Sequence, residues 1–301
     1  MKILVQFSGG KDSQACLISA VREFGKDQVT AVFCDTGWEH ELTYKHINDV
    51  VADLGVELLT LRNASVDGMA GLCRRMKWFP DTQHRMCTVQ LKIYPTIDYV
   101  LSLDDDVMII QGIRAAESAS RSMLACSDDY FKEYNNPTPP EGKKPKELYQ
   151  KRKVREWCKH HRAIVERPFF GASGQEIIDY ILEAGQQPNP LYRRGCSRVG
   201  CFPCIYAKLA ELRVMAKDKP YVERLVRLEH EVNTLRGTVD KTPSSFFPKG
   251  KIPARFCRTY GNGVATFEEI LAYATREDDV PDLFEPEGGY SCMSMYHGLC
   301  E

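Results

Sequence analysis

The stretch that most constrains the fold is KILVQFSGGKDS, residues 2–13, near the start of this 301-residue chain. The apolar run at residues 3–7 is too short for a helix and predicts a buried strand. Gly9 and Gly10 allow a tight turn, and the following QACLISAVREF predicts a helix. A helix N-terminus presents free N–H groups and the positive end of its dipole, so the turn predicts a phosphate or pyrophosphate cradle. The residues expected to form it are Ser8, Gly9, Gly10, Lys11, Asp12 and Ser13.

The loop differs from the Walker A pattern, which has four residues between its first glycine and a GK[ST] triplet. Here Asp12 follows the lysine. A glycine-rich turn after a strand is often only structural. The full hexapeptide at a strand-to-helix junction favours nucleotide binding.

Composition sets the broad class. Lys and Arg number 40 against 41 Asp and Glu, so the formal charge of −1 gives no global attraction to nucleic acid or membranes. The sequence predicts neither a membrane span nor a removable signal peptide. Twelve cysteines in such a chain indicate a reducing compartment, by default the cytoplasm. The oligomeric state stays open, a homo-oligomer included.

Repeated strand–helix–strand patterns after residue 28 predict a doubly wound parallel sheet, with ligands outside the carboxyl ends of its strands. The segment DTGWEHELT follows one such strand. Asp35, Thr36 and Gly37 are therefore candidates to meet a nucleotide or its magnesium. A turn with a helix cap explains the same residues equally well.

A second buried strand is predicted at residues 107–111 and leads into GIRAAESASR. Gly112 lies at its carboxyl end, where Arg114 and Arg121 can offer bidentate contacts to phosphate or sulfate oxygens. Glu117 is expected to orient an arginine. Ordinary charge pairs on an exposed helix are the alternative.

Residues 127–162 are predicted to form an insertion beside the site. Between residues 141 and 162 the sequence has nine Lys or Arg against three Glu, interleaved with Tyr149, Trp157, His160 and His161. Such a stretch suits backbone contacts to nucleic acid, and it also suits a solvated insertion. Further on, Ser173 with Glu176 matches a helix capping box, and a short helix is expected from Thr266.

The cysteines of NPLYRRGCSRVGCFPC form the second chemical centre. Cys196, Cys201 and Cys204 lie within nine residues, which packing explains poorly and metal ligation explains well. Zinc and iron–sulfur clusters both accept such ligands. Cys87 is the first candidate for a fourth ligand because nearby Arg85 favours its thiolate, with Cys292 or Cys300 behind it. Cys292 and Cys300 could alternatively carry a nucleophile, although single free thiols are usually inert.

Together, SGGKDS, DTGWEHELT, RMCTVQLKIYP, GIRAAESASR and NPLYRRGCSRVGCFPC resemble the phosphoadenosine-phosphosulfate reductase family of the PP-loop superfamily. The resemblance implies a Rossmann-like fold of the adenine nucleotide alpha hydrolase type. It suggests a nucleotide-binding domain at residues 1–204, carrying the insertion, and a helical C-terminal region with a flexible tail at residues 205–301. It also implies that Arg114, Glu117 and Arg121 line a substrate pocket.

Members of this family that reduce adenylyl sulfate carry a Cys-Cys pair before a Lys and a Pro, and a later CxxC. Cys87, Lys92 and Pro95 keep that spacing here, while Thr88 replaces the second cysteine. With Cys196 as the natural replacement, the resemblance implies a four-iron, four-sulfur cluster, rather than zinc, on Cys87, Cys196, Cys201 and Cys204.

The intact SGGKDS resembles members that convert ATP to AMP and pyrophosphate with Mg²⁺. It implies adenylation of an acceptor coupled to sulfur transfer, as in sulfurtransferases of DNA phosphorothioation, with Lys11, Arg114 and Arg121 as catalytic residues. A cysteine desulfurase would then supply sulfur. The alternative is a sulfonucleotide reductase that makes sulfite with Cys300 or Cys292 as nucleophile and thioredoxin as partner. A cluster-bearing nucleotide or nucleic-acid sensor is a third, non-enzymatic class.

Overall fold

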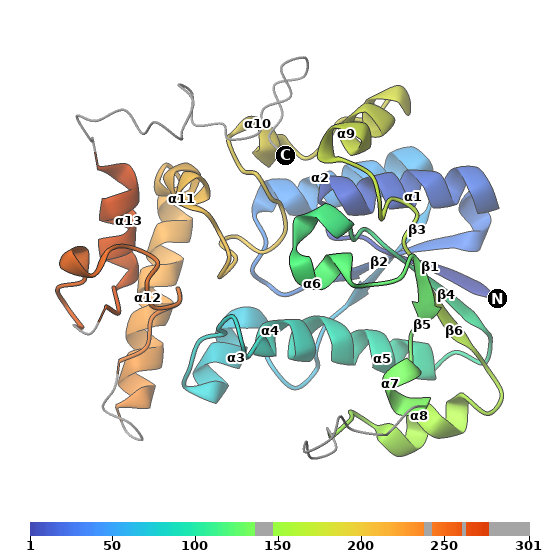
Figure 1. The fold of residues 1–301 in the computed structure, drawn as a ribbon, viewed down its shortest axis with the longest axis horizontal. Coiled ribbons are helices and arrows are strands. Elements are labelled where there is room, and N and C mark those ends of the chain that lie inside the picture. Colours follow the sequence, from blue (N-terminus) through green and yellow to red (C-terminus); the bar gives the residue numbers. More distant parts are fainter. Residues whose placement is uncertain (136–146, 238–242, 261–262, 277–301) are drawn as a thin grey trace. The chain divides into compact units, whose positions relative to one another are not determined.

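The computed structural model describes residues 1–135, 147–237, 243–260 and 263–276 (Figure 1). The chain forms two compact units that interleave along the sequence. The sheet unit comprises Met1–Cys34, Lys45–Leu61 and Ile93–Pro188, and the helical unit comprises Asp35–Tyr44, Arg62–Lys92 and Asn189–Glu301. The domain boundary predicted at residue 204 stays a prediction.

The sheet unit is built on a six-stranded sheet with the order β3-β2-β1-β4-β6-β5. The five strands from β3 to β6 pair in parallel, whereas the edge strand β5 pairs antiparallel with β6. The observed sheet is therefore mixed, whereas the sequence predicted a parallel sheet. Its strands are β1 (Lys2–Gln6), β2 (Val29–Cys34), β3 (Glu57–Leu61), β4 (Val107–Gln111), β5 (Ser127–Asp129) and β6 (Ala163–Glu166).

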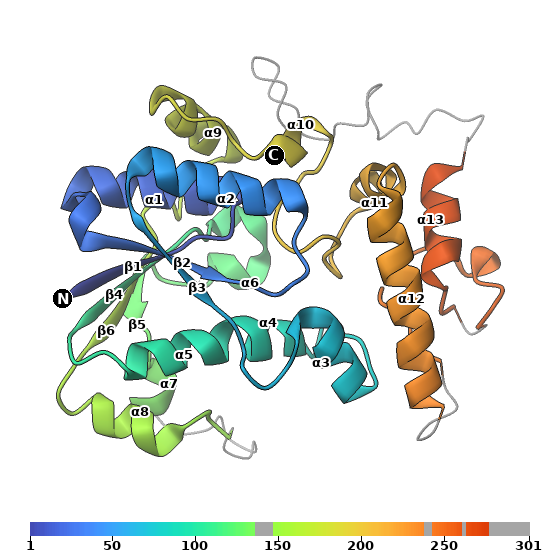
Figure 2. The ribbon, with the colours of Figure 1, turned by 180° about the vertical axis from the view of Figure 1, so that it is seen from behind.

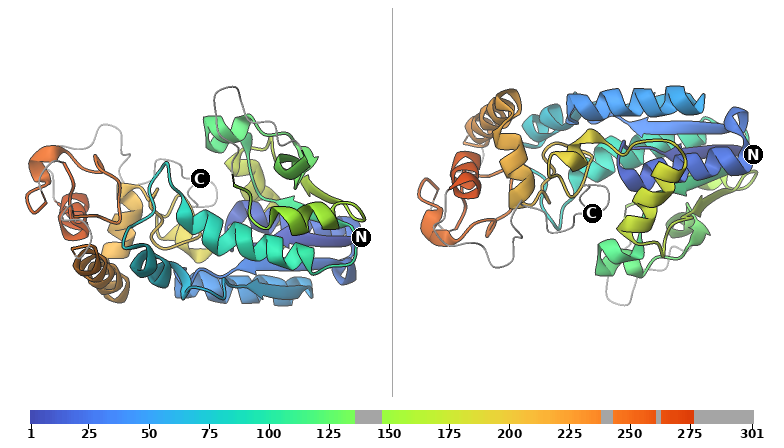
Figure 3. Two further views of the ribbon diagram at one scale, coloured as in Figure 1. Left: turned by 90° about the horizontal axis from the view of Figure 1, so that it is seen from below. Right: turned by 90° about the horizontal axis from the view of Figure 1, so that it is seen from above.

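Helices cover both faces of this sheet, as a doubly wound α/β fold requires (Figures 1 and 2). Helix α1 packs on α9 through Ala15, Ile18, Ile177 and Ile181, and the opposite face packs on α5 and α8. Figure 3 shows the same layers from below and from above. Helices with residues in this unit are α1 (Lys11–Phe24), η1 (Lys26–Gln28), α2 (Glu41–Leu54), α5 (Tyr94–Leu101), η3 (Ala115–Glu117), α6 (Ala119–Ser122), α7 (Lys132–Asn135), α8 (Lys151–Trp157) and α9 (Gly174–Glu183). The Rossmann-like architecture predicted from the sequence is confirmed.

Part of the basic insertion packs into the hydrophobic core of the sheet unit. Trp157 is 8% exposed and packs with the sheet, and Tyr149 stacks on Tyr94 at 3.7 Å between ring centroids. Trp157 on α8 and Tyr149, which precedes the helix, are thus engaged in packing, and contacts of the insertion to nucleic acid stay a prediction. Arg152 and Lys153 on the same helix are exposed. Residues 136–146 of the insertion lie outside the described residues.

The helical unit is held by one apolar cluster that includes Trp38, Leu72, Leu212, Leu228 and Phe267. Helix α13 begins after Thr266, whose hydroxyl accepts from the N–H of Glu269, so the expected helix is confirmed. Helices with residues in this unit are α3 (Gly68–Met76), α4 (Met86–Thr88), η2 (Val89–Ile93), α10 (Pro190–Arg193), α11 (Leu209–Ala216), α12 (Lys219–Arg236), η4 (Ala254–Phe256) and α13 (Phe267–Thr275). None of the helices in the described ranges combines the length and apolar character that a membrane span needs.

A buried polar network ties α1 to α2 inside the sheet unit. The Gln14 side chain donates to Gln186 Oε1 and to the Gln187 carbonyl, both at 3.0 Å. Its Oε1 lies 3.1 Å from His46 Nε2. Burial lowers the pKa of His46 from 6.5 to about 4, so the imidazole is neutral in the folded chain at pH 7.

This lowered pKa predicts a specific acid sensitivity. Between pH 6.5 and 4 the unfolded chain binds a proton at His46 that the folded chain does not, so stability falls as pH falls through this window, by about 3 kcal/mol. His46→Gln should remove that component, measured as the free energy of urea unfolding at several pH values. The exposed His160→Gln is the control. An unchanged pH slope in His46→Gln would contradict the assignment.

Candidate functional site

The turn after β1 is closed by its own serines. Gly9 has φ 76°, a left-handed conformation that glycine adopts freely, and Gly10 is the N-cap of α1. The Ser13 hydroxyl accepts from the N–H of Ser8 at 3.2 Å and donates to the Gly10 carbonyl at 2.9 Å. The sequence predicted this strand–turn–helix geometry correctly. It places the first N–H groups of a 14-residue helix at the carboxyl end of a central strand.

Two cations share one carboxylate at this helix start. Lys11 Nζ lies 3.4 Å from Asp12 Oδ1, and Arg114 Nε donates to the same oxygen at 2.5 Å. Lys11 is 2% exposed and Arg114 is 9% exposed. Burial lowers the pKa of Lys11, Asp12 opposes this shift, and the Arg114 charge adds to it. Two buried cations and one carboxylate leave a net positive charge at this helix start, and positive charge of this kind favours an anion nearby.

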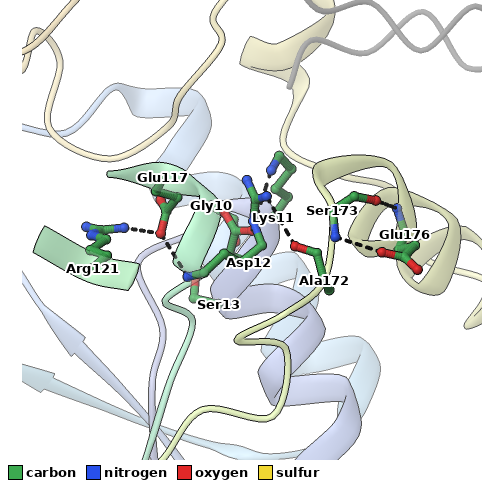
Figure 4. A network of polar contacts seen from close by, with 10 residues as sticks. Gly10, Lys11, Asp12, Ser13, Glu117, Arg121, Ala172, Ser173 and Glu176 are labelled. Carbon is green, nitrogen blue, oxygen red and sulfur yellow. Dashed lines mark hydrogen bonds and ion pairs between the residues drawn. The ribbon is translucent and has the colours of Figure 1, made fainter. Parts of the chain in front are cut away.

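Glu117 organises the segment after β4. Its carboxylate accepts from the Arg114 N–H at 3.0 Å and from the Arg121 guanidinium four residues later (Figure 4). Arg114 also donates to the Ala172 carbonyl at 3.4 Å. The structure thus brings Arg114 to the turn after β1, as a role in anion binding requires. It also pairs Arg121 with Glu117, which is the charge pair that the alternative interpretation expects. Beside it, the Ser173–Glu176 capping box is confirmed.

Gly112 is needed for close approach. A Cβ at this position would lie 2.5 Å from the Ser13 nitrogen and 2.6 Å from the Asp12 carbonyl carbon. Because β1 and β4 are adjacent and parallel, with Gln6 opposite Gln111, the two following loops meet at this glycine. The close approach of the two loops therefore requires glycine at position 112, whether or not a ligand is bound.

In the helical unit, the Asp35 carboxylate holds its own loop. It accepts from the Gly37 N–H at 2.8 Å, from the Tyr44 hydroxyl at 2.7 Å and from Arg62 Nε at 2.8 Å. Thr36 donates to Glu39 Oε1 at 2.7 Å. These contacts are those of a structured turn, and a nucleotide or magnesium role for Asp35, Thr36 and Gly37 stays a prediction.

The four central cysteines belong to the helical unit and share its apolar cluster. Cys196 is 1% exposed, and Cys87, Cys201 and Cys204 are half-buried; all four are free thiols. Burial raises the pKa of Cys87, and the charge of Cys204 adds to this shift. Burial also raises the pKa of Cys201, Lys92 opposes this, and Glu39 and Cys204 add to it. Cys204 is thus an electrostatic neighbour of both other thiols.

These thiols are not arranged as a finished metal site. Among the described residues, no three His, Cys, Asp or Glu side chains form a group that could hold a metal ion. The donor chemistry nevertheless suits iron–sulfur or zinc ligation, because the four cysteines are free thiols and belong to the same apolar packing cluster. The predicted ligand set stays a prediction.

Residues that the sequence analysis did not select hold the cysteine loop, which we define as residues 196–207. The Trp38 indole donates to the Pro203 carbonyl at 3.2 Å, and Arg224 donates to the Phe202 carbonyl at 2.7 Å. Lys251 donates to the Ala207 carbonyl. Glu39 lies 3.7 Å from Cys201 Sγ. Glu39 and Trp38 lie within the recognised DTGWEHELT segment, whereas no local pattern indicates Arg224 or Lys251.

Comparison with known proteins decides the family. The model of the phosphoadenosine phosphosulfate reductase domain matches residues 2–207, which include the turn after β1 and the cysteine loop. The chain belongs to this family. This match confirms the interpretation of the sequence as a nucleotide-binding PP-loop protein. Cys292 and Cys300, the predicted nucleophiles of the reductase alternative, lie outside the described residues.

Two relatives of this reductase-family chain are named as uncharacterized proteins. An uncharacterized 37.8 kDa protein of Escherichia phage 186 is 26% identical over 99% of this chain and 96% of its own length. Uncharacterized protein MJ0066 of Methanocaldococcus jannaschii is 27% identical over 72% of this chain, which spans 39% of that relative.

Two solved structures are similar at low identity. A phosphoadenylyl-sulfate reductase from Candida auris, in a phosphate complex, is 14% identical with a TM-score of 0.46, covering 68% of this chain and 83% of its own. An FMN adenylyltransferase from Candida glabrata, in complex with FMN and an ATP analogue, is 15% identical with a TM-score of 0.42, covering 67% and 55%.

Gly112→Ala tests the close approach of the two loops. The added methyl group overlaps backbone atoms of Asp12 and Ser13, so one loop must move. We expect a loss of about 2 kcal/mol in stability and at least about tenfold weaker binding of adenine nucleotide, measured by denaturant unfolding and calorimetry. Gly171→Ala, whose Cβ would meet nothing within 4 Å, is the matched control. Equal behaviour of the two variants would refute the packing argument.

Proposed function

We propose that this chain binds ATP and adenylates an acceptor oxygen, releasing pyrophosphate, as the activating step of a sulfur transfer. The observation that carries the proposal is the turn of residues 8–13, which keeps both glycines, the serine closure and a buried lysine at a helix start. Such a cradle suits a polyphosphate, because several N–H groups and a cation face the anion together.

In the adenylation step, the acceptor oxygen attacks the α-phosphorus, and the bond from that phosphorus to the bridging oxygen breaks. Pyrophosphate leaves with the electron pair. Lys11 and the N–H groups at the start of α1 would stabilise the charge on the departing oxygens. Arg114, held by Asp12 and Glu117, would contact the α-phosphate of the transferred adenylyl group, and Arg121 would steady the acceptor. Mg²⁺ bound with ATP would neutralise further phosphate charge.

Sulfur handling is assigned to the cysteine loop and Cys87. We assign Cys87, Cys196, Cys201 and Cys204 to a four-iron, four-sulfur cluster, supported by their shared apolar cluster and free thiols. When bound, the cluster would hold or relay sulfur. Lys92 favours the Cys201 thiolate electrostatically, which suits a ligand role. Reduced thiols also fit a cytoplasmic location, with a cysteine desulfurase as a suitable sulfur donor.

Nucleic acid is the acceptor class that the basic insertion suggests. Arg152 and Lys153 form an exposed basic face on α8. Two charges of this kind support backbone contacts without sequence readout.

A sulfonucleotide reductase is the second candidate, favoured by the description of the matching family model. A thiolate of Cys300 or Cys292 would attack the sulfur of an adenylyl sulfate, and the sulfur–oxygen bond to the nucleotide would break. The thiosulfonate left on the cysteine would then need the dithiol of thioredoxin, which is oxidised to a disulfide as sulfite leaves.

The two activities separate in one anaerobic assay. With γ-labelled ATP and Mg²⁺, in the presence of single-stranded DNA or RNA, we expect labelled pyrophosphate and no sulfite. Lys11→Ala should lower pyrophosphate release by about 100-fold, and Lys26→Ala, an exposed lysine beyond α1, should not. In parallel, adenylyl sulfate or its 3′-phosphorylated form is supplied with thioredoxin. Sulfite formation that is lost in Cys300→Ser or Cys292→Ser would overturn the adenylation proposal.

Iron content tests the ligand set. The anaerobically purified protein should hold about four irons per chain. Cys196→Ser should lose most of the iron and the visible absorption of the cluster, and Cys126→Ser, an exposed thiol of the sheet unit, should keep both. Zinc is measured in the same samples. Full iron with an unchanged spectrum in Cys196→Ser would rule out Cys196 as a ligand.

A further inference from the structure

A tyrosine with two arginines forms an exposed surface in the helical unit. The Arg85 guanidinium carbon lies 5.6 Å from the Tyr206 ring centroid, and that of Arg198 lies 6.0 Å from it. Tyr206 is 38% exposed, and both arginines are exposed. The Tyr206 hydroxyl donates to the Thr82 carbonyl at 3.5 Å, which fixes the outer end of the ring. We call these three side chains the Arg–Tyr–Arg surface.

The positive charge of this surface is not neutralised within the described residues. Neither Arg85 nor Arg198 forms an ion pair there, whereas Arg74 pairs with Glu231 and Arg194 with Asp218. The nearest acidic residues in the sequence have other partners. Asp81 accepts from the N–H groups of Gln83 and His84, and Glu211 accepts from the Ser197 hydroxyl and the Lys208 N–H. Two guanidiniums are therefore available to an anionic partner.

Their distances from the ring are close to the outer limit of a cation–π contact. Such contacts contribute little at an exposed site and leave the arginines free to turn toward phosphate. An exposed aromatic ring with guanidinium carbons 5.6 and 6.0 Å from its centroid suits single-stranded nucleic acid, in which each base lies between two phosphates.

We propose that the Arg–Tyr–Arg surface binds single-stranded nucleic acid, with one base stacked on Tyr206 and the flanking phosphates on Arg85 and Arg198. This surface differs from the basic face of α8, because it belongs to the other unit and has an exposed ring. Stacking is tolerant of base identity, so the expected preference is for single strands over duplexes rather than for a sequence.

The surface is interleaved with the cysteines. Arg85 lies two residues before Cys87, Arg198 two residues after Cys196, and Tyr206 two residues after Cys204. A strand bound there would be delivered next to the thiols. As a substrate contact, this role rests on the proposed sulfur transfer, whereas binding of the strand itself does not.

The experiment measures fluorescence anisotropy of a labelled oligothymidylate with the full chain, without ATP, across a salt series. Tyr206→Leu should weaken binding about tenfold, and Tyr206→Phe should keep it within about twofold, since stacking needs only the ring. Arg85→Ala and Arg198→Ala should each weaken binding about three- to tenfold and lower the salt slope by about 1. Lys217→Ala with Lys219→Ala, two exposed lysines of the same unit, is the matched control and should bind as the unchanged chain does. Photocrosslinking with a bromouracil oligonucleotide should label the peptide that contains Tyr206.

Two results would overturn the proposal: no binding of the oligonucleotide at low salt, or binding by Tyr206→Leu, Arg85→Ala and Arg198→Ala that equals binding by the unchanged chain. Its failure is distinguishable from failure of the adenylation proposal. Strand binding without pyrophosphate release from ATP would support the Arg–Tyr–Arg surface and contradict the adenylation proposal. Pyrophosphate release without strand binding would support adenylation and contradict the surface.

Discussion

The parallel pairing of β1 with β4 is the constraint on which the predicted nucleotide site depends. Because Gln6 lies opposite Gln111, the loops that follow β1 and β4 both begin at the carboxyl end of the sheet. The backbone at Gly112 then lies against Asp12 and Ser13. Only then can Arg114 reach the Asp12 carboxylate, 102 positions earlier in the chain. The cradle is therefore shared between two loops, although its recognisable motif lies entirely in one.

Charge burial explains why those loops need each other. Lys11 and Arg114 repel one another, and burial disfavours the charged form of Lys11. Asp12 lies between them and offsets both costs, and Glu117 fixes the segment that follows. An incoming phosphate would enter a site that already holds its counter-charges in place, so little reorganisation would accompany binding.

Sequence reasoning succeeded where local chemistry determines local structure. The turn at residues 8–13, the strand at residues 107–111 and the cap at Ser173 each carry their signal in a few adjacent residues. It failed where distant residues decide. The polar SDD of β5 has no strand pattern and forms a strand only because β6 offers an edge. The sequence did not indicate that Trp157 packs in the core of the sheet unit, because that packing depends on residues distant from α8 in the chain. The partners of Asp35, such as Arg62, carry no local signal either.

The same reasoning applies to the cysteine loop. The family match ends at residue 207, yet Arg224 and Lys251 lie beyond it and bind carbonyl groups of the loop. Apolar residues from α11, α12 and α13 share one cluster with Cys87 and Cys196. Burial in that cluster raises the pKa of Cys87 and Cys201 and keeps thiols protonated unless a metal or a cation compensates. The helices after the loop therefore help to set the chemistry of its cysteines, and the part of the chain beyond the family match belongs to the candidate site.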